Sequence, residues 1–439
     1  MNSSNVEKII ALLNSSHSQF HVVKNIKNEL SKKGFVELDE KADWDIKRGG
    51  NYFVTRNNSS IIAFKIPENC NDFSFSATAT HNDSPTFKLK PNPLIKRGDL
   101  TLLDVEPYGG MIYSTWLDRP LSIAGRLMVE KDGHIEERLF DCDRPLLSIP
   151  NLAIHMNRSI NKGYEYNPAE DLLPLFSSSF PIEKTFNDFL LEEIGAEDAK
   201  ILSHDLFLYN RDEARLFGYQ NEFLSAPRLD DLSSVYSTLL GFLASRNSNR
   251  LSLFLSFDNE EVGSLTRQGA NGTFFKDIYN RIVSSFGLSD DKKAKSIANS
   301  ILLSIDNAHA NHPCHRSISD ETTNVKLNGG IVIKYNANQS YTSDAPSSAI
   351  VKKIAMDNDI PYQEFTNRSD LKGGSTLGNI SNSELSVISC DIGLSELAMH
   401  SSNETMGAKD LDYMSKFVAR YFSSHIEMEG DKIHIRIKK

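Results

Sequence analysis

Residues 251–263 have the sequence Leu-Ser-Leu-Phe-Leu-Ser-Phe-Asp-Asn-Glu-Glu-Val-Gly. The first seven are apolar or small and predict a buried strand. Glu260 and Glu261 follow it directly, at the position where α/β proteins bind ligands, beyond the carboxyl ends of their strands. We therefore expect a sheet that carries acidic side chains along one edge.

Predicted helices and strands alternate along the surrounding chain. Helices are expected at 6–13, 20–33, 229–243, 266–286, 294–299 and 345–358, and strands at 61–66, 73–78, 251–257, 301–305 and 385–390. Such alternation is typical of parallel sheets that are covered on both faces. The predicted fold class is α/β, with a mixed, mostly parallel sheet sandwiched by helices.

A β-rich stretch interrupts this pattern. Short β-type segments at 100–105, 121–130 and 135–140 are separated by turn signals such as Tyr108-Gly109-Gly110. We expect residues 1–87 and 213–439 to form one discontinuous domain. Residues 88–212 would form a β-rich domain inserted in it.

The composition argues against several classes of protein. The 439 residues are 39% hydrophobic and 24% charged, as in globular proteins, and the net charge of −10 argues against a nucleic-acid partner. No apolar run approaches the roughly 18 residues of a membrane span, and the N-terminal residues lack a signal-peptide pattern. Four cysteines without a CxxC pair fit reduced thiols, so we expect a cytoplasmic protein without a membrane partner.

Histidine and acidic residues also recur after other predicted elements. They are His81 and Asp83, Asp230, Asp306, and His400. Imidazole and carboxylate are ligands that zinc accepts, and two neighbouring cations need a carboxylate that bridges them. A single acidic residue at a strand end is often only a solvated loop residue. The joint occurrence is more specific and indicates a two-metal hydrolytic centre.

Seven segments resemble those of a known family. They are ATHNDSP (79–85), YSTWLDRPLSIAGR (113–126), RPLLSIPNLAIHMNR (144–158), APRLDDL (226–232), FDNEEVGS (257–264), SIDNAHANHP (304–313) and LAMHS (397–401). In these the chain resembles an M18-family metalloaminopeptidase, the group that includes aspartyl aminopeptidase. The resemblance implies a zinc-exopeptidase-like catalytic domain and makes the insertion a dimerisation domain.

The resemblance also implies a ligand set for two divalent metal ions. Asp230 would bridge the ions, His81 and Asp306 would complete one site, and Glu261 and His400 the other. Zinc is the first choice, although such nitrogen and oxygen ligands also accept cobalt or manganese.

Two further carboxylates receive roles by the same resemblance, Glu260 as general base and Asp83 as the residue that orients His81. One position departs from the family pattern, because Asp231 stands where an asparagine is usual. We expect an extra carboxylate to be tolerated there, at a helix N-terminus.

Other candidate residues lie outside the metal ligands. The resemblance gives His155, in the insertion, a catalytic role in the active site of the neighbouring subunit, and places Lys334 in the pocket for an acidic substrate side chain. On sequence alone, a core histidine and an edge-strand lysine are the simpler interpretations. The glycine-rich loop at 373–378 lacks the P-loop pattern, so Gly374 and Ser375 are expected to bind the peptide.

The segment Ala308–His315 contains His309, His312 and His315, whose spacing fits no zinc motif, and we do not expect them to be ligands. The predicted function is removal of N-terminal residues from short peptides, preferably acidic ones. The alternatives are an aminopeptidase for neutral residues such as leucine, a related two-metal deacylase, and an inactive scaffold. The resemblance implies homodimers that assemble into a dodecamer.

Overall fold

The computed structural model describes residues 5–70, 72–246, 249–371, 373–374, 376, 378 and 384–437. Its largest element is a nine-stranded sheet. In spatial order the strands are β1 (Val36–Glu37), β2 (Asn51–Arg56), β3 (Ser60–Lys65), β13 (Leu251–Phe257), β4 (Phe75–His81), β14 (Ile301–Ile305), β18 (Ile388–Gly393), β16 (Ile331–Tyr335) and β17 (Tyr362–Thr366). Five neighbouring pairs run parallel and three antiparallel, which confirms the predicted mixed, mostly parallel sheet.

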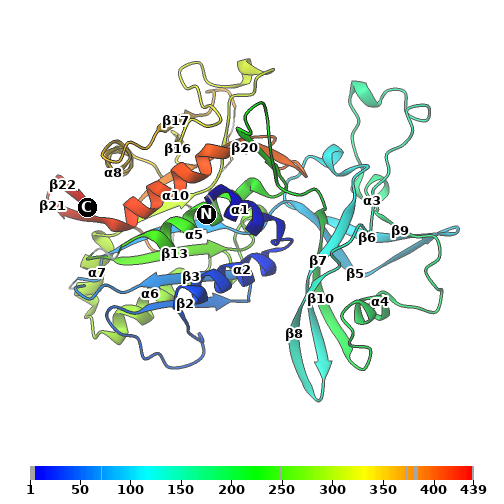
Figure 1. Ribbon diagram of the computed structural model, residues 1–439, viewed down its shortest axis with the longest axis horizontal. Helices are drawn as coiled ribbons and strands as arrows, with labels where there is room; N and C mark the ends of the chain where they lie inside the picture. The colour runs from blue at the N-terminus through cyan, green and yellow to red at the C-terminus, as the bar shows by residue number, and fades with distance from the viewer. Residues whose placement is uncertain are drawn as a thin grey trace.

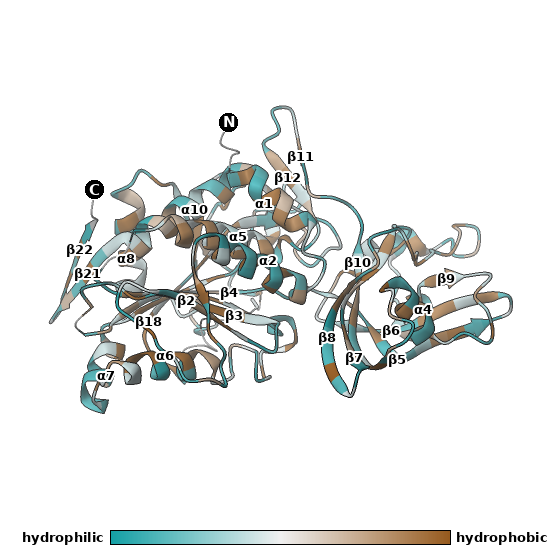
Figure 2. Cartoon of the chain, turned by 60° about the horizontal axis from the view of Figure 1, so that its bottom comes forward, coloured by the Kyte–Doolittle hydropathy of each residue, from teal (hydrophilic) through white to brown (hydrophobic). Residues whose placement is uncertain are grey.

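Helices cover both faces of this sheet, as Figures 1 and 2 show. One face carries α1 (Asn5–Asn14), α2 (Gln19–Lys32), α5 (Leu229–Ala244), α8 (Ala345–Met356) and α10 (Ala408–Ser423), and the other carries α6 (Phe274–Ser285) and α7 (Asp290–Ala298). The strand Leu251–Phe257 is buried along its whole length. Its side chains alternate between the two faces, since Phe254 packs in the α5–α10 core and Leu253 and Leu255 pack against α6.

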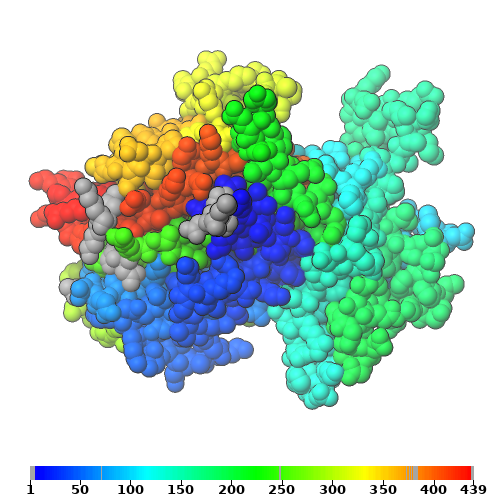
Figure 3. All heavy atoms as spheres, viewed as in Figure 1, coloured from blue at the N-terminus to red at the C-terminus, as the bar shows by residue number. Residues whose placement is uncertain are grey.

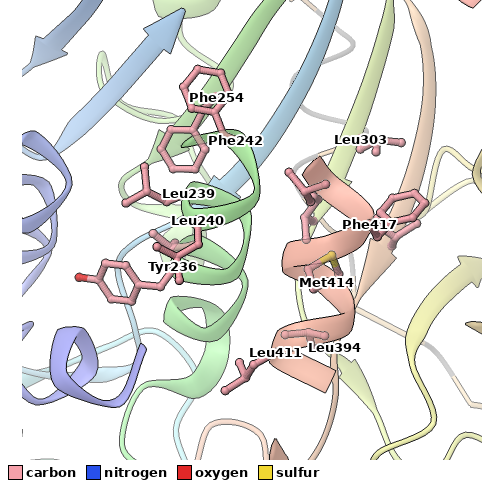
Figure 4. Close-up of a cluster of buried hydrophobic side chains, with 14 of the residues drawn as sticks. Tyr236, Leu239, Leu240, Phe242, Phe254, Leu303, Leu394, Leu411, Met414 and Phe417 are labelled. Atoms are coloured by element: carbon pink, nitrogen blue, oxygen red, sulfur yellow. The ribbon is translucent and has the colours of Figure 1, made fainter. Parts of the chain in front are cut away.

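The core on the first face is built around α5 and α10. Figure 4 shows Phe242 on α5 and Phe417 on α10 among apolar side chains that include Phe254 of the sheet. The two helices approach closely at Gly241, where an added Cβ would lie 2.5 Å from the main-chain oxygen of Ser415. Helix α5, whose first turn carries one candidate metal ligand, is thus packed closely against α10.

The second lobe is an antiparallel sheet on the right of Figure 1. In order its strands are β8 (His134–Asp141), β7 (Leu121–Lys131), β10 (Lys200–Asn210), β5 (Thr86–Arg97), β6 (Leu100–Tyr108) and β9 (Leu175–Ser177). Its core includes Phe87, Trp116 and Leu206, and α4 (Phe186–Glu193) packs on it. The short elements η1 (Tyr113–Trp116), η2 (Ile160–Lys162) and α3 (Pro168–Asp171) complete the lobe.

Two small sheets and two short helices complete the fold. They are the sheet β11 (Arg215–Phe217), β12 (Phe223–Ala226), β20 (Glu404–Gly407), β19 (Ser395–Leu397) and β15 (Ala308–His309), the hairpin β21 (Ser424–Glu429) and β22 (Lys432–Ile437), η3 (Glu260–Val262) and η4 (Arg316–Ile318). Among the described ranges, no helix combines the length and apolar character that a bilayer crossing requires.

The lobes meet along the N-terminal helices, which lie against the β-rich lobe in Figure 3. His17, between α1 and α2, is 2.6 Å from the carboxylate of Asp141 and stacks on the ring of Tyr209. Arg126 of β7 lies 4.3 Å over the ring of Phe20 and donates to the main-chain oxygen of Asn57. The β-rich lobe is thus held against the larger one by polar and aromatic contacts.

Two expectations about elements need correction. The helix expected at 266–286 begins only at Phe274, because residues 264–272 turn tightly on themselves. An added Cβ at Gly269 would lie 2.3 Å from the main-chain oxygen of Ser264. The strand expected at 385–390 is β18, which begins at Ile388 and continues to Gly393.

Candidate metal centre

Three neighbouring parallel strands bring four candidate residues to one edge of the sheet. His81 is the last residue of β4, Glu260 and Glu261 follow β13, and Asp306 follows β14. Because β13, β4 and β14 are hydrogen-bonded side by side in parallel, their carboxyl ends lie together. The sequence-based expectation that acidic and histidine side chains lie along one edge of the sheet agrees with these positions.

Asp230 and His400 reach the same place from the small sheet. Asp230 lies at the start of α5, just after β12, and His400 lies between β19 and β20. Strands β12 and β20 pair with Ala226 opposite Glu404. The carboxylate of Glu404 then accepts the main-chain N–H groups of His400 (2.7 Å) and Asp230 (3.1 Å), which ties the two segments together.

Asp230 occupies the centre of the cluster. Its Oδ1 lies 3.2 Å from Nε2 of His81, and its Oδ2 lies 3.4 Å from Nε2 of His400. Nε2 of His81 is also 3.9 Å from Oδ1 of Asp306, and Nε2 of His400 is 3.5 Å from Oε1 of Glu261. One carboxylate oxygen therefore faces each histidine, as a bridging ligand requires.

The other ring nitrogen of each histidine faces an acceptor. Nδ1 of His400 is 2.6 Å from the main-chain oxygen of Gly110, and Nδ1 of His81 is 3.2 Å from that of Asp83. A proton on Nδ1 leaves the lone pair of a neutral imidazole on Nε2, directed at Asp230. A lone pair opposite a carboxylate oxygen is repulsive unless a proton or a cation lies between them.

The charges of the cluster favour cations. Burial alone would lower the pKa of both histidines, but the surrounding carboxylates outweigh this effect. They raise the pKa of His400 to about 10 and that of His81 well above its ordinary value. Burial and neighbouring carboxylates raise the pKa of Glu261, and raise that of Glu260 to about 7. Excess buried negative charge of this kind is what a metal ion neutralises.

Three groups of side chains could hold such ions, each with its ligand atoms within 4.8 Å of one another. They are His81–Asp230–Asp306, Asp230–Glu261–His400 and His81–Glu260–Glu261. Oδ1 of Asp230 and Oε1 of Glu261 are buried and have no hydrogen-bond partner among the described residues. The first two groups share Asp230, so the residues present fit two cations.

Asp83 organises the neighbours of His81. Its Oδ1 lies 3.5 Å from Nδ1 of His81 and accepts the main-chain N–H of Glu260 at 3.1 Å. Its Oδ2 accepts the N–H of Glu261 at 3.2 Å and the hydroxyl of Tyr108 at 2.7 Å. Asp83 therefore contacts both the histidine and the turn that carries the two glutamates.

Asp231 lies in the first turn of α5, at the expected helix N-terminus. It is fully buried, and its Oδ2 accepts the main-chain N–H of His81 at 3.3 Å. Burial and the neighbouring carboxylates Asp306 and Asp230 raise its pKa well above the ordinary value. Its side chain instead supports the strand end that carries His81.

A pocket opens onto the cluster. It is lined by the cluster and by further residues that include His309, Lys334, Tyr341, Phe365, Gly374, Thr376 and Met399. Lys334 is 2% exposed and donates to the main-chain oxygens of Asp306 (2.8 Å) and Asn307 (3.1 Å). Gly374 lies on the wall of this pocket, whereas Ser375 lies outside the described residues.

His155 is not part of this cluster. It is exposed in the segment 151–164 of the β-rich lobe, near the apolar side chains of Leu152, Ile154 and Met156, which are 50%, 47% and 77% exposed. The segment protrudes from the lobe at the upper right of Figure 1. His155 therefore cannot act as a buried core histidine within its own chain.

The histidine-rich segment divides into two parts. His309 lines the pocket, whereas the rings of His312 and His315 lie 4.9 Å apart on a turn before η4. None of the three belongs to the ligand groups found among the described residues.

Two contributing residues, Tyr108 and Glu404, were not predicted from the sequence. In the sequence Tyr108 is part of a turn signal, and Glu404 stands four residues after His400. Both act through hydrogen bonds to residues distant in the chain. The sequence Tyr108-Gly109-Gly110 indicates a turn, but it does not indicate which residues Tyr108 contacts.

The chain is similar to a family of zinc metalloproteases. Residues 12–422 match the family model of the aminopeptidase I zinc metalloproteases, M18. The probable M18 family aminopeptidase 2 of Clostridium acetobutylicum is 41% identical over 95% of this chain and 98% of its own length. That of Pseudomonas aeruginosa is 35% identical over 95% and 97%.

Solved structures agree with the fold. A chain in the cryo-EM structure of the Ape4 and Nbr1 complex gives a TM-score of 0.91 at 35% identity, covering 95% of this chain and 85% of that chain. The S. cerevisiae mApe1 dodecamer gives a TM-score of 0.84 at 26% identity, covering 95% and 97%. By the family match and by these relatives, the chain belongs to the M18 family of zinc metalloproteases and is an aminopeptidase, a hydrolase of peptide bonds.

Proposed function

We propose that this aminopeptidase uses two divalent cations, with zinc as the first choice. One cation would be bound by His81, Asp230 and Asp306, and the other by Asp230, Glu261 and His400. The observation that carries this proposal is the orientation of Asp230, with one carboxylate oxygen toward Nε2 of each histidine. Two cations held there supply a Lewis acid for the scissile carbonyl and lower the pKa of the attacking water.

The chain's own residues then supply the proton transfers. Glu260 lines the pocket beside the proposed ligands, and its main-chain N–H is fixed by Asp83. We assign two roles to Glu260. As general base it takes a proton from the attacking water, and as general acid it returns a proton to the departing amine. Its neighbour Glu261 points at His400 and acts as a ligand.

The proposed preference for acidic N-terminal residues rests on Lys334. Although burial lowers its pKa, Asp306 and other neighbouring groups raise it above the ordinary value, so the side chain carries a charge. Two of its three N–H donors have main-chain acceptors, and the Lys334 nitrogen lies 3.7 Å from Oδ2 of Asp306. Lys334 lines the pocket, and we assign its third donor to a substrate carboxylate.

The proposed active unit is a homodimer in which His155 stabilises the oxyanion in the partner's site. Its exposure on an apolar, protruding segment supports a role in contact with another copy of the chain. The proposed larger assembly is a dodecamer, as in the mApe1 structure, and it would admit short peptides.

Metal analysis tests the two-ion centre. Fully loaded wild-type protein should hold two zinc ions per chain, and His400→Ala should hold one, since a ligand of only one ion is removed. His309→Ala is the matched control, because His309 lines the pocket outside the ligand groups, and it should still hold two. One ion in the loaded wild-type protein, measured by mass spectrometry under native conditions, contradicts the proposal.

Glu260→Gln tests the general base. The variant should keep both ions while kcat falls by roughly 10²–10⁴, the range typical of general-base catalysis. Glu261→Gln, one residue away, should instead lose metal. Near-normal kcat for Glu260→Gln at full metal content, in a chromogenic aminoacyl assay, refutes the assignment.

Lys334→Met tests the substrate preference. The ratio of kcat/KM for Asp- and Glu-peptides to that for Leu-peptides should fall by about tenfold or more, since a charged hydrogen bond is worth about 1.5–3 kcal/mol. Lys352→Met, which removes a half-buried lysine paired with Glu364, should leave the ratio unchanged. An equal loss on all peptides indicates that Lys334 only supports Asp306.

Subunit mixing tests His155. His155→Ala should lower kcat by about 10²–10³, as removal of an oxyanion donor does, and Met156→Ala should not. Mixing His155→Ala chains with Glu260→Gln chains under exchange conditions should restore activity, because mixed dimers contain one complete site. No restoration, with mixed dimers confirmed by mass, rules out action between subunits.

A further inference from the structure

The connection between β6 and η1, residues 108–112, reaches from the β-rich lobe to the metal centre. The hydroxyl of Tyr108 donates to Oδ2 of Asp83 at 2.7 Å and accepts a hydrogen bond from Nδ2 of Asn259 at 2.9 Å. Two residues later, the main-chain oxygen of Gly110 is 2.6 Å from Nδ1 of His400. The lobe therefore contacts the surroundings of both proposed histidine ligands within its own chain.

This approach is close. Gly109 has a φ of +76°, and a Cβ added there would lie 3.1 Å from the Cβ of Glu261. The main-chain N–H of Ile112 donates to the main-chain oxygen of His400 at 3.0 Å. The connection is thus packed directly against the loops that carry Glu261 and His400.

We propose that Tyr108 is a positioning residue of the metal centre. Its hydroxyl fixes the Asp83 carboxylate and, through it, the ring of His81 and the turn of Glu260 and Glu261. The proposal rests on the proposed function, because it takes His81 as a metal ligand.

The hydrogen bonds of Asp83 support this role. The carboxylate is 2% exposed, and its donors are two main-chain N–H groups of the glutamate turn and the Tyr108 hydroxyl. Among the donors found in the described part of the chain, Tyr108 is the one from the β-rich lobe. A hydroxyl bonded to a buried carboxylate is a charge-assisted hydrogen bond and holds its acceptor in a narrow range of positions.

Tyr108 also holds the other end of the same turn. Asn259 precedes the two glutamates in the left-handed conformation, with φ of 65°, and donates its side-chain amide to the Tyr108 oxygen. One hydroxyl therefore bridges the first residue of the turn and the carboxylate that binds the next two. Its loss releases both restraints together.

The test is Tyr108→Phe in the full-length protein. The variant keeps the ring, which packs edge-on against Phe207 with centroids 5.4 Å apart, and removes only the hydroxyl. We expect zinc affinity, measured by competition with a chromophoric chelator, to fall about 10–100-fold, as it does on loss of outer partners of metal ligands. We also expect kcat to fall about tenfold while KM stays within about twofold.

Tyr279→Phe is the matched control. Tyr279 is buried on α6, and its hydroxyl is 2.7 Å from Oγ of Ser296, so the same change removes a comparable hydrogen bond far from the site. Thermal unfolding of both variants measures the purely structural effect. If Tyr108→Phe changes zinc affinity and kcat no more than Tyr279→Phe does, Tyr108 is not a positioning residue.

A double-mutant cycle identifies the route of the effect. In an Asp83→Asn background, Tyr108→Phe should lower zinc affinity by a smaller factor than it does in the wild-type background, because part of its effect passes through Asp83. Full additivity overturns the proposal. The zinc content of His81→Ala tests the proposed ligand set separately from the role of Tyr108. If His81→Ala holds as much zinc as the wild-type protein, the proposed ligand set is wrong, whatever the effect of Tyr108→Phe.

Discussion

The carboxylate of Asp230 faces two imidazoles at once, and the rest of the site depends on that arrangement. A buried carboxylate loses several kcal/mol of hydration, which only well-placed partners offset. His81 arrives from a strand of the main sheet and His400 from a loop of the small sheet. The helix start, the strand end and the loop must therefore be held in fixed positions relative to one another.

The fold meets this requirement with main-chain hydrogen bonds to acidic side chains. Glu404 joins the segments of Asp230 and His400, and Asp231 holds the strand end at His81. These carboxylates are buried, so each hydrogen bond is stronger than it is in water. The acidic residues around the centre thus divide into those that face the pocket and those that fix its walls.

Sequence reasoning predicted the part of the site that depends on strand order. Parallel strands end at one edge, so His81, Glu261 and Asp306 could be expected together from their positions after predicted strands. The mixed α/β sheet followed from the same alternation. The helix α10 was not predicted, although Phe417 and Met414 lie in the main core. Its apolar residues are interrupted by Asp410, Lys416 and Arg420.

The remaining contacts have no sequence signal, because their partners are distant in the chain. The carboxylate of Asp83 and the hydroxyl of Tyr108 are separated by 25 residues and belong to different lobes. The resemblance suggested that Asp83 orients His81, but its bonds to the glutamate turn became visible only in the fold. Nor could periodicity separate Gly374, on the pocket wall, from an ordinary loop glycine.

The adjacent glutamates show how one carboxylate can set two different roles. Asn259, in the left-handed conformation, starts a short helical turn, and the main-chain N–H groups of Glu260 and Glu261 donate to opposite oxygens of Asp83. Since the turn is fixed through its main chain, the two side chains are free to diverge, one along the pocket and the other toward His400. The same Asp83 lies beside Nδ1 of His81. The positions of the proposed base and of the proposed ligands are therefore set relative to one buried group, and a shift of that group moves them together.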